Sequence, residues 1–318
     1  MNFSIRHVNE DDFQLIKLTD ETAGTEAVLL PGCGALLHAF RVRGRDGSLF
    51  NVIDNYRDSA DLRTNIGTSF KGPKLSPFPC RIPDGVYQFD NKNYRLEHLF
   101  PDGTAIHGLL YDKPFTVVQE AVGDQGAGLV LEYAYRNDDP GYPFQYNCQV
   151  RYTLHNGNDL EIVTTVTNVD KTAIPMADGW HPYFRLGGKV DEWTLQFYSE
   201  AIVDFDDRLV PTGHLTPYNT FEKARPVGDL FLDNCFSLKP AIVSAACELY
   251  NPSNGLRVCF FPDASYPYLQ LYTPSSRESI AVENLSGAPD CFNNGLGLLS
   301  LQPGHSQIFT VRYKVSVD

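Results

Sequence analysis

The segment QVRYTLHNGNDLEIVTTVTNV, residues 149–169, indicates the fold class most clearly. Apolar and polar residues alternate in 149–154 and again in 160–169, as in strands with one buried face. An Asn156-Gly157 pair lies between these runs, and Asn-Gly between two alternating runs is among the strongest short-range signals for a β-hairpin. The segment therefore predicts two adjacent antiparallel strands.

The same pattern extends in both directions along the chain. Strands are expected at Phe13–Leu18, Ala27–Leu30, Ala35–Val42, Val86–Phe89, Tyr94–Leu96, Leu129–Tyr135, Leu195–Tyr198, Ala201–Phe205, Ala241–Tyr250, Leu256–Phe261, Tyr268–Tyr272, Ile280–Val282 and Ile308–Val317. Further hairpin turns are expected at 90–93 and at Asn254-Gly255, and a short helix at 58–65. No 12-residue window has a convincing helical period, and no linker divides the chain. We predict an all-β fold of packed sheets in a single domain, residues 1–318.

Composition excludes several classes of partner. The net charge is −13 and no basic run occurs, so the sequence does not predict nucleic-acid binding. No stretch approaches the length of a membrane span, and the N-terminal residues do not resemble a signal peptide. The seven cysteines are scattered and include no CxxC pair, which is typical of reduced thiols. These features predict a cytoplasmic protein, and they leave its oligomeric state open.

The most informative polar residue is His181, in the segment DGWHPYF at 178–184. Pro182 biases the preceding residue toward an extended backbone, which gives the imidazole a defined direction. We expect Trp180, Tyr183 and Phe184 to form apolar walls of a small-molecule pocket. Without the rest of the chain, an ordinary core or strand-end histidine explains this segment better than a functional one.

Four other polar residues lie in apolar surroundings at expected strand ends. Arg81 follows a proline-rich run that excludes a helix, and His107 precedes a glycine that would permit close approach of a ligand. Asp233 and Glu283 lie beside apolar strands. Each residue alone could be structural, but together they offer an acid/base pair and groups that bind hydroxyls. No histidine or cysteine pair has the spacing of a zinc site, so no metal is predicted.

Several segments occur in the order seen in one enzyme family. They are Pro79–Ile82, Ala105–Gly108, Gly179–Phe184, Leu232–Phe236, Val282–Asn284 and Ala288–Asn293. The chain is thereby similar to the aldose 1-epimerases, or galactose mutarotases, from residue 25 to residue 315. The resemblance implies a β-supersandwich that binds a monosaccharide in an open cleft.

The resemblance also implies a role for each candidate residue. His181 corresponds to the general acid and Glu283 to the general base, while Arg81, His107 and Asp233 correspond to residues that bind the sugar. The implied activity is interconversion of the α and β anomers of a free aldohexose such as glucose or galactose, without cofactor. Anomer exchange needs a base at the C1 hydroxyl and an acid at the ring oxygen, which we expect on opposite sides of the C1–O5 bond.

Two departures from the family pattern leave the preferred sugar open. The usual Asn-Arg-Ile reads Cys80-Arg81-Ile82, and the usual His-Gly-Gly reads His107-Gly108-Leu109. One alternative is a hexose-6-phosphate 1-epimerase in which Lys71 and Lys74 meet the phosphate. Another is a non-catalytic carbohydrate-binding protein of the same fold, because a fold alone does not establish activity.

Overall fold

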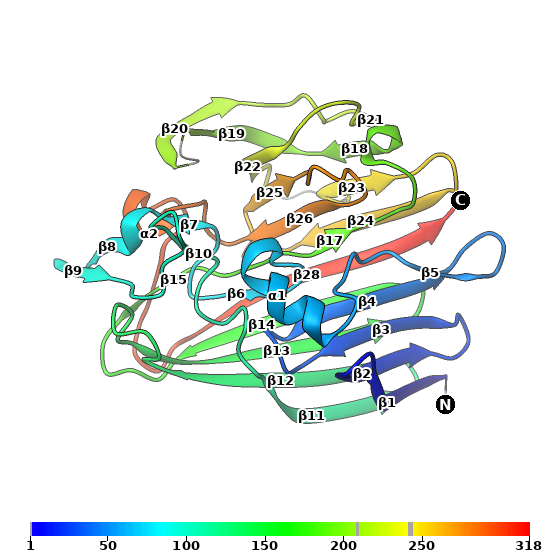
Figure 1. Cartoon of the computed structure of the whole chain (residues 1–318), viewed down its shortest axis with the longest axis horizontal. Coiled ribbons are helices and arrows are strands. Elements are labelled where there is room, and N and C mark those ends of the chain that lie inside the picture. The colour runs from blue at the N-terminus through cyan, green and yellow to red at the C-terminus, as the bar shows by residue number, and fades with distance from the viewer. Residues whose placement is uncertain (1, 208–209, 241–243) are drawn as a thin grey trace.

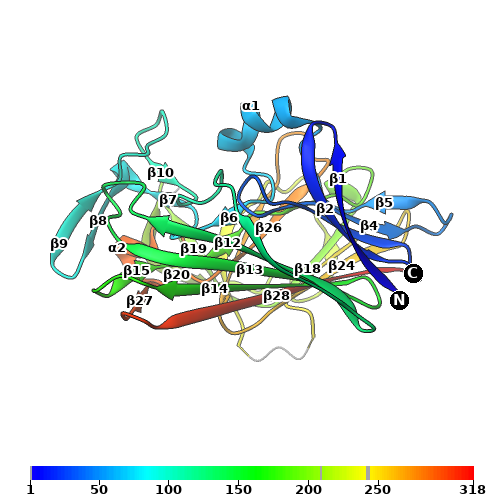
Figure 2. The same cartoon turned by 90° about the horizontal axis from the view of Figure 1, so that it is seen from below.

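A computed structural model describes residues 2–207, 210–240 and 244–318 (Figure 1). The chain is built almost entirely of antiparallel strands, which confirms the all-β fold class. The β8–β9 hairpin projects at one end of the molecule, and both termini lie at the other (Figure 1, Figure 2). Within these described residues, no helix is long and apolar enough to cross a membrane.

Three large sheets contain most of the strands. The five-stranded sheet has the order β1 (Phe3–Glu10), β2 (Phe13–Asp20), β3 (Thr25–Leu30), β4 (Leu36–Arg43), β5 (Leu49–Asn51). The nine-stranded sheet has the order β11 (Thr116–Gly123), β12 (Gly126–Arg136), β13 (Gln145–His155), β14 (Asp159–Asn168), β28 (Ser306–Val317), β24 (Leu256–Pro262), β23 (Cys247–Tyr250), β18 (Thr194–Phe197), β21 (Arg225–Pro226). The eight-stranded sheet has the order β20 (Pro211–Pro217), β19 (Ser199–Phe205), β22 (Asp233–Leu238), β25 (Tyr268–Tyr272), β26 (Ile280–Leu285), β16 (Gly179–Trp180), β6 (Lys74–Leu75), with β17 (Tyr183–Phe184) also paired to β26.

Short elements complete the fold. The small strand pairs are β7 (Arg81–Ile82) with β10 (Ala105–Ile106), β8 (Val86–Phe89) with β9 (Lys92–Arg95), and β15 (Ile174–Met176) with β27 (Leu299–Leu301). The helices are α1 (Ser59–Ser69) and α2 (Cys291–Asn294), with 3-10 turns at Pro83–Gly85 and Val190–Glu192. The predicted helix is confirmed in α1, which begins after Asp58, whose carboxylate accepts from the Asp61 amide at 2.8 Å.

The large sheets share one hydrophobic core. It includes Leu18 and Phe40 from the five-stranded sheet, Tyr152 and Val311 from the nine-stranded sheet, and Leu269 from the eight-stranded sheet. The predicted hairpin at residues 149–169 is confirmed as β13 and β14, and alternate residues of β13 face this core. The alternation in the sequence therefore reports the face of the sheet that is buried.

Several strand boundaries differ from the predictions, among them the following three. The turn before β9 is Asp90-Asn91 alone, both with positive φ, so β9 begins at Lys92 rather than at residue 94. The strand expected at 241–250 includes residues 241–243, which lie outside the described residues, and β23 begins at Cys247. The strand expected at 280–282 continues to 285, which places Glu283 inside β26 and not at its end.

A glycine is needed at position 108 for a different reason from the one predicted. A side chain at this position would come within 2.3 Å of the Ser76 carbonyl oxygen, and its φ is +77°. The Leu109 amide donates to that same carbonyl at 2.7 Å. The glycine thus allows close approach of the protein's own backbone, not of a ligand.

A fully buried ion pair joins β6 to the segment that leads into β16. Lys74 Nζ donates to Asp178 Oδ1 at 2.5 Å and to the Gly179 carbonyl at 2.9 Å. Tyr266 donates to the same Asp178 oxygen at 2.6 Å, and the Asp178 amide donates to Ser286 Oγ at 2.8 Å. Because Ser286 directly follows β26, these bonds hold β6, β16 and β26 together.

We expect Lys74→Met to lower the free energy of unfolding by about 3–5 kcal/mol, because the substitution leaves the buried Asp178 carboxyl group without its cationic partner. Urea denaturation followed by circular dichroism measures the loss. Lys92→Met, at an exposed position of β9, is the control and should change stability by less than about 0.5 kcal/mol. Equal midpoints for the two variants would contradict a structural role for the ion pair.

Candidate active site

All five candidate residues from the sequence line one cavity of about 380 Å³. They come from widely separated segments: Arg81 from β7, His107 from the residue after β10, His181 from between β16 and β17, Asp233 from the start of β22, and Glu283 from β26. Strand pairing thus brings together polar groups that are distant in the chain. A cavity of this size is within the range of small-molecule sites.

His181 and Glu283 lie side by side in this cavity. Their closest atoms, Nε2 and Oε1, are 3.4 Å apart, and both side chains are buried. The contact follows from pairing on either side of His181, because Gly179 pairs with Leu285 and Tyr183 pairs with Ala281. The segment that contains His181 and the strand that contains Glu283 are therefore held in register around the imidazole and the carboxyl group.

This geometry corrects one expectation about the acid and the base. A separation of 3.4 Å leaves no room for a sugar ring between Nε2 and Oε1 in this structure. They face the same cavity from adjacent positions. In a purely sugar-binding protein of this fold, His181 and Glu283 would lie too far apart to flank one ring oxygen, and the separation of 3.4 Å does not favour that alternative.

Burial disfavours the charged forms of both groups. It lowers the pKa of His181 to about 4. Burial, and then the negative charge of Asp233, raise the pKa of Glu283 well above its usual value. Each group retains a polar atom without a hydrogen-bond partner among the described residues, Nδ1 of His181 and Oε2 of Glu283. Unpartnered buried polar atoms at a cavity are the groups to which a polar ligand binds.

His107 is oriented by the loop that contains Cys80. The Cys80 amide donates to His107 Nδ1 at 3.3 Å, and the His107 amide donates to the Cys80 carbonyl at 2.9 Å. Burial lowers the pKa of His107 well below its usual value, and electrostatic repulsion from His181 and Arg81 adds to this shift. A neutral ring whose Nδ1 accepts carries its proton on Nε2, so this nitrogen is a hydrogen-bond donor.

Arg81 and Asp233 occupy the more open part of the cavity. Arg81 Nη1 lies 3.1 Å from Asp102 Oδ2, and the arginine side chain is 29% exposed. Asp233 accepts from Gln270 Nε2 at 2.9 Å. Burial raises the pKa of Asp233, although Arg81 and Gln270 oppose that shift. The two side chains supply a forked donor and an acceptor, which suit vicinal hydroxyls.

The expected aromatic walls are only partly correct. Tyr183 lines the cavity and stacks on the His181 ring at 5.1 Å, whereas Trp180 and Phe184 belong to the hydrophobic core. Side chains alternate in direction along an extended chain, so residues 181 and 183 share one face and residues 180 and 184 point away from it. The sequence reasoning treated these aromatics as one group and overlooked that alternation.

Three further residues at the cavity were missed. Phe70 packs on the His107 ring at 4.6 Å, and Gln270 pairs with Glu283 across β25 and β26. Cys80 also lines the cavity. Gln270 has a recognisable signal, because it is the one amide in the apolar run 268–272. Phe70 has no signal of its own in the sequence, although its neighbours Thr68, Ser69 and Lys71 also line the cavity.

The two lysines proposed for phosphate binding have different positions. Lys71 lines the cavity, where its Nζ lies 2.9 Å from Asp54 Oδ2. Lys74 is fully buried against Asp178, and its Nζ lies 4.2 Å from the Trp180 ring. Lys74 therefore cannot contact a phosphate in the cavity, which corrects half of that hypothesis.

Comparisons with known proteins agree with this architecture. The chain is 28% identical over 249 residues to protein YihR of Escherichia coli (strain K12), covering 76% of this chain and 78% of that protein. It is 23% identical over 322 residues to an aldose 1-epimerase of Streptococcus thermophilus, covering 88% of each chain.

Solved structures show the same fold. A galactose mutarotase-like protein from Clostridium acetobutylicum superimposes with a TM-score of 0.87 at 18% identity, covering 100% of this chain and 99% of the other. The galactose 1-epimerase from Lactobacillus acidophilus NCFM superimposes with a TM-score of 0.81 at 21% identity, covering 99% of this chain and 98% of the other. The family model described as aldose 1-epimerase matches residues 14–314. The chain belongs to the aldose 1-epimerase family.

Proposed function

We propose that the protein is a mutarotase that interconverts the α and β anomers of a free aldohexose such as glucose or galactose. The observation that carries the proposal is the buried contact of 3.4 Å between His181 and Glu283 at the cavity. Adjacent groups suit this reaction because the two oxygens that exchange protons, O1 and the ring oxygen O5, are bonded to the same carbon.

In the ring-opening step, Glu283 takes the proton of the C1 hydroxyl while His181 gives a proton to O5. The C1–O5 bond breaks, and the electron pair of the O1–H bond forms the C1 carbonyl. Rotation about C1–C2 presents the other face of the aldehyde, and the reverse proton transfers close the ring. Every atom and electron balances within the sugar and the two side chains, so we propose that no cofactor is needed.

The proton count of the pair fits this cycle. A carboxylate with an imidazolium holds one proton, and so does a carboxylic acid with a neutral imidazole. Burial favours the second arrangement in the free protein through the pKa shifts of His181 and Glu283. Bound sugar would therefore have to move the proton from Glu283 to His181 before the ring opens, and ring opening returns the pair to the second arrangement. The site would therefore stabilise the proton arrangement that accompanies the open-chain aldehyde, which is a transient species in water.

Arg81, His107 and Asp233 are the proposed contacts to the sugar hydroxyls. Arg81 and the Nε2 proton of His107 donate, while Asp233 accepts, so the cavity offers both kinds of partner. The lining combines these charged and polar groups with the aromatic rings of Phe70 and Tyr183. This combination suits a monosaccharide, which has polar edges and an apolar ring face.

A hexose 6-phosphate remains the alternative substrate, because Lys71 lines the cavity. The ion pair with Asp54 argues against it, since the carboxylate neutralises the lysine and would repel a phosphate. Asp54 also accepts from Ser279 at 2.9 Å, which holds the carboxylate at this position.

We expect Glu283→Gln and His181→Asn each to lower the rate of mutarotation by about 10²- to 10⁴-fold, the usual contribution of one positioned acid or base. Polarimetry or NMR of freshly dissolved α-glucose and α-galactose measures the rate. Glu278→Gln, at an exposed glutamate paired with Lys189, should keep the wild-type rate. Full activity of Glu283→Gln, or no catalysis with any common aldose, would refute the proposal.

The choice between free and phosphorylated sugar is tested by inorganic phosphate and Lys71→Met. For a free aldohexose we expect no competition by phosphate, and a change in kcat/KM below about fivefold in the variant, as for a partly exposed ion pair. Glucose 6-phosphate should be the poorer substrate. Competitive inhibition by phosphate, together with loss of glucose 6-phosphate turnover in Lys71→Met, would instead support the alternative.

The raised pKa of Glu283 predicts a specific pH dependence of stability. From about pH 4.3 upward the unfolded carboxyl loses its proton while the folded one keeps it, so stability falls with pH until the folded pKa is reached. Glu283→Gln removes this decline, so its unfolding free energy should rise relative to wild type between pH 5 and pH 8.

Urea denaturation at several pH values measures that difference. Glu278→Gln is the matched control, because Lys189 lowers the pKa of this exposed carboxyl and both states are ionised throughout the range. Its difference from wild type should be constant. A constant difference for Glu283→Gln as well would show that Glu283 is ionised in the folded protein.

A further inference from the structure

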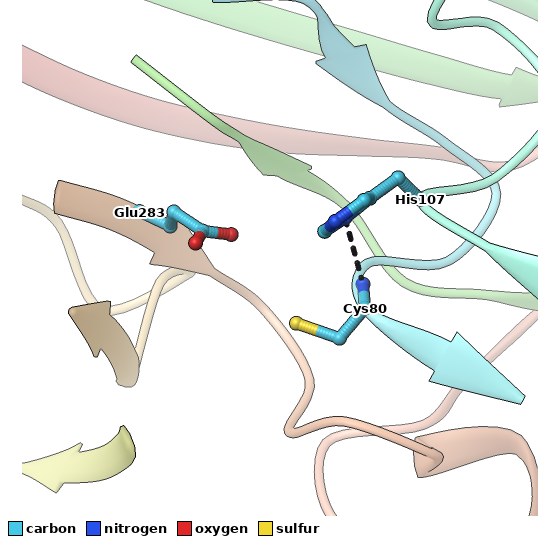
Figure 3. Close-up of side chains that lie close together, drawn as sticks. All are labelled: Cys80, His107 and Glu283. Carbon is cyan, nitrogen blue, oxygen red and sulfur yellow. Dashed lines mark hydrogen bonds between the residues drawn. The ribbon is translucent and has the colours of Figure 1, made fainter. Parts of the chain in front are cut away.

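Three different metal-ligating side chains converge at the inner end of the cavity. One ligand atom each of Cys80, His107 and Glu283 lies within 4.8 Å of the other two, and all three residues are buried. Figure 3 shows the Cys80 sulfur and the Glu283 carboxyl group pointing toward each other, with the His107 ring beside them. Sequence spacing did not indicate this group, because its members come from three separate segments.

The backbone holds two of these side chains in place. Cys80 and His107 both have left-handed conformations, with φ of 54° and 60°, which are uncommon for residues other than glycine. Their reciprocal hydrogen bonds, Cys80 amide to His107 Nδ1 and His107 amide to Cys80 carbonyl, lock one loop to the other. Glu283 is fixed within β26 and retains Oε2 without a hydrogen-bond partner among the described residues.

We propose that Cys80, His107 and Glu283 form a binding site for a soft divalent cation of the Zn²⁺ class. A sulfur, a nitrogen and an oxygen ligand suit Zn²⁺ or Cd²⁺, whereas Mg²⁺ and Ca²⁺ need oxygen ligands throughout. The thiolate and the carboxylate would balance the two positive charges, which removes most of the cost of burying the ion. Three protein ligands leave one coordination position open toward the cavity.

The geometry requires a small adjustment. Ligand atoms around a tetrahedral zinc lie roughly 3.5 Å apart, given metal–ligand distances of about 2.0–2.3 Å. The three side chains must therefore approach one another by about 1 Å, which side-chain rotation at a cavity wall permits.

Occupancy would shut off the activity proposed above. Glu283 cannot ligate a cation and also take the proton of the C1 hydroxyl, so metal and sugar would compete for the site. This consequence rests on the proposed function, but the binding of the cation itself does not.

Titration of the metal-free protein with Cd²⁺ tests the site directly, because a thiolate bound to Cd²⁺ has its own ultraviolet charge-transfer absorption. We expect one equivalent to bind and to produce this band. Cys80→Ser, a near-isosteric change, should abolish the band and weaken binding at least about 100-fold, the upper range for loss of even an outer-shell partner. Circular dichroism confirms that the variant is folded.

The matched control is Cys259→Ser. Cys259 is only partly buried and its Sγ lies 3.6 Å from Glu248 Oε2, so it is the rival thiol–carboxylate pair. This variant should keep the band. Glu283→Gln should weaken Cd²⁺ binding but keep a thiolate band.

A band that persists in Cys80→Ser, or that disappears in Cys259→Ser, would overturn the proposal. Unchanged Cd²⁺ affinity in Glu283→Gln would show that the Glu283 carboxylate is not a ligand of the cation. Inhibition of mutarotation by Cd²⁺, relieved by excess sugar, is the separate test of competition. If Cd²⁺ does not inhibit mutarotation although it produces the absorption band that depends on Cys80, the result would count against the proposed function and not against the metal site.

Discussion

The buried contact between Lys74 and Asp178 is the interaction on which the site depends most. It lies at the junction of β6, β16 and β26, and through Ser286 it reaches the end of the strand that contains Glu283. An isolated charge in this environment would be strongly destabilising, so the two residues require each other. That mutual requirement holds the His181 segment against β26.

The proposed acid and base, His181 and Glu283, occupy positions that are unfavourable for stability. Glu283 lies in the middle of a fully buried strand, where an apolar side chain would be more stable, and it keeps an unpartnered oxygen. His181 is buried beside it with a lowered pKa. Such unfavourable burial is typical of functional sites, because a low-dielectric site without competing water strengthens interactions with a substrate.

Left-handed backbone conformations also occur at the same cavity. Phe70, Cys80 and His107 line it, and all three have positive φ. Each belongs to a connection rather than to a long strand, and the surrounding sheets hold these connections in place. Cys80 therefore combines two unusual properties, a left-handed backbone and a thiol directed toward the carboxyl group of Glu283, which makes this departure from the family pattern more than a neutral exchange.

Local pattern was sufficient to predict the all-β class, the hairpin at residues 149–169 and a set of five polar residues in apolar surroundings, because alternation and turn chemistry act between near neighbours. It was not sufficient to predict that β26 extends past Glu283, that Trp180 and Phe184 turn into the core, or that Cys80 joins the site. Those features depend on pairing between segments far apart in the chain, such as β16 and β17 with β26. Distances between side chains are set by that pairing, and a linear pattern contains no information about it.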